Sequence, residues 1–185
     1  MIHFMEGFVE SLKSTVDRLQ HILLQYGISF CVMGGASLPY YGVSRTTDDI
    51  DILVAIQDKD KLQHLPPSYL RDVSNERGRV FMLEGKTKIE VIYSKDKLNG
   101  EKGTPYPSPE GISHNNLIDL YWLVYFKMEA QLYNEHRYGD FDDVKNLIKE
   151  NGLPESYLDE TREDMSIQYQ KLWKSAHAPT LFDVE

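Results

Sequence analysis

Two aspartates stand at alternate positions where an apolar run begins. Asp49 and Asp51 flank Ile50 and lead into the run 52–56, which has the composition of a strand. Because side chains alternate across a strand, the two carboxylates share one face and the apolar side chains share the other. At about 5 Å and an effective dielectric near 20, two carboxylates repel by about 3 kcal/mol, a penalty that a divalent cation removes. The pattern therefore predicts a metal-binding strand.

A bare pair has a simpler explanation. The chain has 29 acidic residues among 185, so such pairs arise by chance, and two aspartates on an edge strand also keep it soluble. The glycine pair upstream favours the metal site. The apolar run 28–33 ends at Gly34 and Gly35, fourteen residues before Asp49. Glycines at that place let the backbone approach a phosphate, with the amides of the next helix and the Ser37 hydroxyl beside it, although a tight turn also uses two glycines.

The segment before the acidic strand adds two candidate phosphate contacts. Arg45 can donate two hydrogen bonds to a phosphate or pair with Asp48 instead. Thr47 can contact the nucleotide or serve as a turn residue. Asp48 competes with Asp49 for the metal, but strand alternation favours Asp49, which shares its face with Asp51.

A third carboxylate is predicted on a later strand. The runs 79–83 and 88–93 form a predicted hairpin with its turn at 84–86. Glu90 faces opposite Ile89 and Val91 there, so it could ligate a second metal or accept the proton of an attacking hydroxyl. An ordinary exposed glutamate on a hairpin is the alternative.

The remaining pattern predicts a core of residues 1–112 with an N-terminal helix, a helical extension over 113–176 packed on that core, and a loose tail over 177–185. A helix over 5–26 ends at Gly27, and shorter helical pieces cover 36–41 and 59–65. Residues 94–113, rich in glycine and proline, form a long loop that is either a functional cover or disordered. Three helices follow, over 115–133, 141–150 and 156–174.

Composition narrows the class of protein. The net charge of −9 disfavours a dedicated nucleic-acid binder, although the balance between Arg71 and Lys102 is +2. Cys31 is the only cysteine, which excludes an internal disulfide and a cysteine-rich zinc site. No apolar run reaches membrane-spanning length and the N-terminus lacks a secretory pattern, so we expect a cytoplasmic protein without a membrane partner.

Three segments in order resemble the DNA polymerase β-like nucleotidyltransferase superfamily, particularly its minimal and abortive-infection-type members. The segments are Met33-Gly34-Gly35, Asp49-Ile50-Asp51 and Ile89-Glu90-Val91, with Arg45-Thr46-Thr47-Asp48 before the acidic pair. The resemblance implies an α+β (α/β-like) fold: a nucleotidyltransferase-type mixed sheet flanked by helices, with a C-terminal helical extension. It also implies Mg²⁺ or Mn²⁺ held by Asp49, Asp51 and Glu90.

The activity that the resemblance implies is transfer of a nucleoside monophosphate from a nucleoside triphosphate such as ATP to a hydroxyl or amine acceptor, with release of pyrophosphate. A tRNA end, a protein side chain and a small molecule all stay open as the acceptor, as do the preferred nucleotide and the oligomeric state. Lys127, on the first C-terminal helix, either approaches the triphosphate as in relatives or lies at the edge of the apolar stripe. Arg137, Asp140 and Asp143 resemble a second family segment, but Gly139 stands where relatives often have lysine. A catalytically silent nucleotide-binding or interaction module and an unrelated metal-binding domain are the alternatives.

Overall fold

The chain divides into two compact units in this computed structural model, which describes residues 2–75, 78–98, 103–134 and 138–178. The first unit comprises Met1–Pro39 and Ser44–Asp119, and the second comprises Tyr40–Val43 and Leu120–Glu185. The first unit therefore runs past residue 112, where the sequence pattern placed the boundary. None of the described helices is long and apolar enough to cross a membrane.

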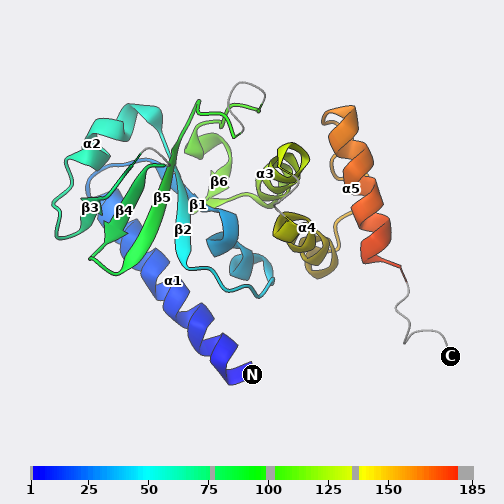
Figure 1. Ribbon diagram of the computed structural model, residues 1–185, viewed down its shortest axis with the longest axis horizontal. Helices are drawn as coiled ribbons and strands as arrows, with labels where there is room; N and C mark the ends of the chain where they lie inside the picture. Colours follow the sequence, from blue (N-terminus) through cyan, green and yellow to red (C-terminus); the bar gives the residue numbers. More distant parts are fainter. Residues whose placement is uncertain (1, 76–77, 99–102, 135–137, 179–185) are drawn as a thin grey trace. The chain divides into compact units, whose positions relative to one another are not determined.

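The first unit holds the strands and the second holds three helices (Figure 1). The elements of the first unit are α1 (Ile2–Gln25), β1 (Phe30–Met33), η1 (Gly34–Tyr41, whose end enters the second unit), β2 (Asp49–Val54), η2 (Ile56–Asp58), α2 (Lys59–Gln63), β3 (Leu70–Asp72), β4 (Val80–Leu83), β5 (Thr87–Tyr93), η4 (Pro109–Gly111), β6 (Ser113–His114) and β7 (Leu117–Ile118). The second unit contains α3 (Leu120–Tyr133), α4 (Tyr138–Asn151) and α5 (Glu163–Ala176).

The described strands form one mixed sheet in the order β3-β4-β5-β2-β1-β7-β6. The central pair, β2 and β5, is parallel, whereas β1 with β2 and β4 with β5 are antiparallel. The predicted hairpin is confirmed by the β4–β5 pairing. A mixed sheet with helices confirms the predicted α+β fold class.

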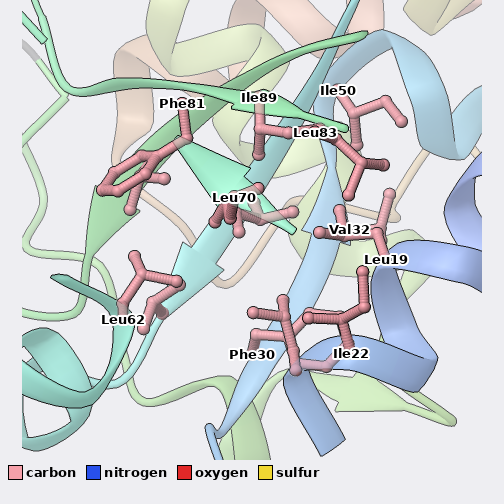
Figure 2. Packing of buried hydrophobic residues seen from close by; sticks show 14 of the residues in the cluster. Leu19, Ile22, Phe30, Val32, Ile50, Leu62, Leu70, Phe81, Leu83 and Ile89 are labelled. Carbon is pink, nitrogen blue, oxygen red and sulfur yellow. The ribbon is translucent and has the colours of Figure 1, made fainter. Parts of the chain in front are cut away.

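The core lies on one face of this sheet (Figure 2). Alternate residues of β1, β2, β4 and β5 contribute to it, and α1 adds a stripe that includes Val16, Leu19 and Leu23, each at most 1% exposed. Burying one such side chain contributes about 1.5–3 kcal/mol. In β2 the core residues are Ile50, Ile52 and Val54. The acidic residues of β2 must therefore point to the opposite face, as the alternation predicts.

Two predicted helices begin later than expected. Residues 115–119 were predicted to be helical, but Asn115 and Asn116 adopt left-handed conformations (φ 51° and 59°) in the turn between β6 and β7. Asparagine tolerates that conformation better than most residues. Residues 156–162 were also predicted to be helical, but they form successive turns before α5 begins at Glu163. The short strands β3, β6 and β7 were not predicted, because two or three residues show no readable alternation.

The predicted loop over 94–113 is partly packed structure. Tyr106 is 3% exposed, its amide donates to the Asp96 carbonyl at 2.8 Å, and its carbonyl accepts from the Lys95 amide at 2.8 Å. Pro109 begins the short helix η4, and Ile112 after it is buried. These contacts hold the described part of the loop against its own unit. Residues 99–102 lie outside the described residues, as does most of the predicted tail.

Candidate active site

The three predicted carboxylates lie on one face of two adjacent strands. In the parallel pairing of β2 with β5, Asp51 is the partner of Glu90 and Asp49 is the partner of Lys88. Partners in neighbouring strands lie about 5 Å apart and project to the same side of a sheet. These two pairs therefore form a patch on the face opposite the core. The patch contains Asp49 and Asp51 from β2, and Lys88 and Glu90 from β5.

The glycine after β1 makes room for the carboxylate of Asp51. Gly34 has φ +63°, and a Cβ at this position would lie 1.9 Å from Asp51 Oδ2. Strand β1 pairs Met33 with Asp51, so the chain turns directly over the acidic residue. Any side chain at Gly34 would displace the carboxylate. The glycine is thus required by the position of Asp51, in addition to its left-handed backbone.

Thr47 holds the other aspartate. Its hydroxyl lies 3.1 Å from both the carbonyl oxygen and the Oδ1 carboxylate oxygen of Asp49, and it donates to one of them. A Cβ at Gly35 would lie 3.1 Å from Thr47 Oγ1, so the second glycine gives the threonine space. Thr47 therefore orients a candidate metal ligand. The predicted contact between Thr47 and a nucleotide stays a prediction.

Lys88 is the cation of this patch, and the sequence reasoning missed it. Its ammonium lies 3.4 Å from Asp49 Oδ2 and forms a short ion pair with Glu90. The hydrogen bond to Glu90 raises the pKa of Lys88 above its usual value, aided by Asp49 and opposed by burial. All three side chains are partly exposed, at 42%, 33% and 42% for Lys88, Asp49 and Glu90. The signal for Lys88 was present: it stands two residues before Glu90, and so on the same strand face.

A divalent metal ion is the group that the nucleotidyltransferase resemblance implies for this face. Carboxylate oxygens are the ligands that Mg²⁺ prefers. Because Gly34 has no side chain, the Asp51 carboxylate has room beside the backbone there. The carboxylates of Asp49, Asp51 and Glu90 are thus the type of ligand that such an ion prefers. As placed, however, the described residues contain no group of three His, Cys, Asp or Glu side chains close enough together to hold one. Two of them, Asp49 and Glu90, share Lys88 instead.

The other predicted phosphate contacts near β2 are placed differently. Ser37 is fully buried and donates to the Gly34 carbonyl at 2.8 Å, so its hydroxyl stabilises the turn and does not face solvent. Arg45 is partly buried in the segment before β2. Asp48 is exposed and precedes the strand, whereas Asp49 is its first residue. The structure therefore places Asp49 on the face with Asp51, as strand alternation favoured.

Lys127 belongs to the second unit and is neither at the edge of an apolar stripe nor solvent-facing. It lies in the buried stretch 123–131 of α3, and its ammonium contacts Asp140 Oδ1 at 3.0 Å and Asp143 Oδ2 at 2.6 Å on α4. Both carboxylates are buried as well. The predicted approach of Lys127 to the triphosphate stays a prediction. Arg137 lies outside the described residues.

A cavity of about 370 Å³ lies beside Glu90 in the first unit. Residues of β4, β5 and the segment before β4 line it, among them Arg79, Val80, Lys88, Glu90 and Ile92. Two of the lining residues, Lys88 and Glu90, also belong to the carboxylate patch. The cavity is in the size range of sites for small molecules.

Cys31 does not take part in this chemistry. It is fully buried, and burial is the main reason that the pKa of its thiol is raised to about 12. A thiol with that pKa is protonated at neutral pH and is a poor nucleophile.

The fold of this chain can be compared with solved structures. An antigenic nucleotidyltransferase-like protein from Paracoccidioides brasiliensis superposes with a TM-score of 0.59 over 91% of this chain and 89% of that chain, at 17% sequence identity. This chain has the polymerase β-like nucleotidyltransferase fold. The antibiotic-resistance factor ANT(2'')-Ia shares the nucleotidyltransferase fold with it, at a TM-score of 0.52 and 8% identity over 91% of this chain and 93% of that one. No family model and no curated protein matches the sequence. The narrower minimal or abortive-infection-type assignment stays a prediction.

Proposed function

We propose that this protein is a metal-dependent nucleotidyltransferase, which transfers a nucleoside monophosphate from a nucleoside triphosphate to a hydroxyl or amine acceptor and releases pyrophosphate. The observation that supports this most is the register of β2 with β5, which sets Asp49, Asp51 and Glu90 on one face beside Gly34. A nucleotidyltransferase fold with all three acidic positions filled has the residues that this chemistry needs.

The reaction forms a bond from the acceptor oxygen or nitrogen to the α-phosphorus and breaks the bond from that phosphorus to the oxygen of the leaving pyrophosphate. A bound divalent ion would supply neutralisation of the charge that develops on these oxygens. Asp49 and Asp51 would hold it, with Thr47 orienting Asp49. Glu90 lines the cavity and is the candidate to receive the acceptor proton.

The acceptor approaches from the Glu90 side in this proposal. The 370 Å³ cavity opens at that carboxylate and is partly apolar, through Val80 and Ile92, and partly cationic, through Arg79. A nucleophile bound there would lie next to the proposed base. A tRNA end, a protein side chain and a small molecule each present a single hydroxyl or amine, so all three stay within the proposal.

A second candidate, nucleotide binding without turnover, is favoured by one observation. Lys88 already compensates Asp49 and Glu90, and the carboxylates are not gathered for an ion. A silent module would bind nucleotides through the same face without transferring a nucleotidyl group. The two candidates differ in whether label from a nucleotide becomes covalently attached to another molecule.

The test uses three single substitutions. Asp49→Asn and Asp51→Asn are expected to weaken Mg²⁺-dependent binding of nucleoside triphosphates by tenfold or more, measured by calorimetric titration with each nucleotide. Asp48→Asn is the matched control, because Asp48 is exposed and precedes the strand, and it should bind as wild type does. Wild-type affinity in both of the first two variants would refute the site.

Turnover is tested separately with α-³²P-labelled nucleotides and cell extract. Transfer of label into RNA, protein or a small molecule by wild type, and its loss in Asp51→Asn, would support the enzyme and identify the class of acceptor. Binding without any transfer of label would instead support the silent module.

A further inference from the structure

The charges on the carboxylate face are already partly balanced by a residue of the same face. The three carboxylates of Asp49, Asp51 and Glu90 have a formal charge of −3, and the Lys88 ammonium, in contact with two of them, brings the formal charge of these four side chains to −2. Lys88 and Glu90 are two residues apart on β5, and Lys88 is the register partner of Asp49 on β2. The ammonium is therefore built into the patch by the strand register.

This position conflicts with a metal ion at the same carboxylates. Lys88 contacts one oxygen of Asp49 and one oxygen of Glu90, so an ion that binds these two carboxylates competes with the ammonium, because two cations at one pair of carboxylates repel each other. In the described residues no three-ligand group is assembled while Lys88 bridges the pair. Metal binding and the Lys88 contacts are thus alternatives.

We propose that Lys88 is an internal counter-cation that keeps the carboxylates of Asp49 and Glu90 from binding a divalent metal until a nucleoside triphosphate arrives. Mg²⁺ in such sites is usually held by one or two carboxylates together with substrate phosphates. A metal that arrives with the triphosphate brings phosphate oxygens, which give the displaced ammonium of Lys88 a new partner. A metal that arrives without a nucleotide brings no phosphate oxygens and gives the Lys88 ammonium no new partner. The inference rests on the metal site of the proposed function, and it makes metal loading depend on the nucleotide.

The length and exposure of Lys88 suit this role. The side chain is 42% exposed, so its ammonium has solvent-accessible space to move into without unpacking the core. A buried lysine such as Lys127, which is 8% exposed between two carboxylates, has no such freedom. Lys88 also lines the cavity beside Glu90, where a bound substrate would meet it.

The experiment measures Mn²⁺ binding without nucleotide, by electron paramagnetic resonance of the free ion at low ionic strength. Lys88→Met removes the one positive charge of these four side chains, which makes their formal charge more negative, −3, and is expected to lower the Kd for Mn²⁺ by tenfold or more, which corresponds to about 1.4 kcal/mol. Lys88→Arg keeps the charge and should bind Mn²⁺ as weakly as wild type. Lys86→Met, in the turn of the same hairpin, is the matched control, because among the described residues Lys86 forms no salt bridge with these carboxylates. It should also behave as wild type.

The double variant Lys88→Met with Asp49→Asn shows where the gained ion binds. If the double variant no longer shows the tighter Mn²⁺ binding of Lys88→Met, the ion binds at the carboxylate face. If the double variant still binds Mn²⁺ more tightly than wild type, the proposal is overturned. An unchanged Kd in Lys88→Met, with a wild-type melting curve that shows the variant is folded, would overturn it too. So would equally tight binding in Lys86→Met.

Failure of this inference can be told apart from failure of the proposed function. If Lys88 is not a counter-cation but the enzyme assignment is right, the wild type still binds Mg²⁺ with nucleotide and loses this in Asp51→Asn. If the proposed nucleotide and metal site is absent, that nucleotide dependence is absent too, and label transfer separates an enzyme from a silent module. Nucleotide titrations of wild type beside the Mn²⁺ series therefore distinguish the two.

Discussion

Substituting Gly34 by alanine tests whether the turn after β1 exists to accommodate a carboxylate. Gly34 and Gly27 have almost the same φ, +63° and +61°, both in the left-handed region. A Cβ at Gly27 would meet nothing within 4 Å, whereas a Cβ at Gly34 would meet Asp51 Oδ2 at 1.9 Å. The two alanine variants therefore share the backbone strain and differ in the clash.

The expected magnitudes follow from these two contributions. A non-glycine residue in the left-handed region costs about 1–2 kcal/mol, so Gly27→Ala should lower the free energy of unfolding by that amount. Gly34→Ala adds the displacement of Asp51, whose oxygen must move by about 1 Å or more to reach the 3.0 Å that real Cβ contacts respect. Forcing a side chain off its rotamer costs about 0.5–1.5 kcal/mol. We therefore expect about 2–3 kcal/mol for Gly34→Ala.

The assay pairs urea unfolding with Mg²⁺-dependent nucleotide binding. Gly34→Ala should weaken that binding by tenfold or more, because Asp51 is displaced, while Gly27→Ala should leave it unchanged. Adding Asp51→Ala to Gly34→Ala removes the obstructing carboxylate, so the double variant should be about 1 kcal/mol more stable than additivity predicts. Equal destabilisation by the two glycine substitutions, with nucleotide binding intact in both, would show that Gly34 is only a turn residue.

Two further predictions concern buried charges. Lys127→Met leaves two buried carboxylates on α4 without their cation, and should lower the free energy of unfolding by about 3–5 kcal/mol, measured in urea; a cost below 1 kcal/mol would show that the ammonium does not hold the helices together. Asp58 accepts from the Ser29 amide at 2.8 Å and pairs with Lys61, and although burial opposes the shift, these bonds lower its pKa below the usual 3.8. Because the folded-state pKa is the lower one, this stabilisation is present above pH 3.8 and is lost as the pH falls through the folded-state value. Asp58→Asn should thus cost about 1 kcal/mol at pH 7, and this cost should shrink as the pH falls below 3.8, measured by thermal unfolding over a series of pH values; a cost that does not change with pH would contradict a charge effect.

Much of the carboxylate face follows from strand alternation. The separation of Asp49 from Asp51 by one apolar residue, and of Glu90 from its apolar neighbours, assigned each to the polar face of a strand before any fold was known. The glycine after the first strand was likewise visible in the sequence. Strand alternation does not predict that β2 pairs with β5, because the packing of the whole sheet decides which distant strands pair.

The second unit was harder to predict for the same reason. Helical periodicity found α3, α4 and α5, but it gave two of their starts too early, since turns stabilised by local hydrogen bonds can carry a helix-like pattern. From the sequence, Lys127 was predicted either to approach the triphosphate or to lie at the edge of the apolar stripe. Its burial between Asp140 and Asp143 depends on how α3 packs on α4, which the periodicity of one helix does not reveal.

The sequence alone determined which residues share a face, since the period of a strand or helix is a local property of the backbone. Tertiary structure decided which faces meet: that Asp51 lies over Gly34 and that Lys88 stands between Asp49 and Glu90. Those contacts join segments up to about forty residues apart, and only the sheet register brings them within hydrogen-bonding distance.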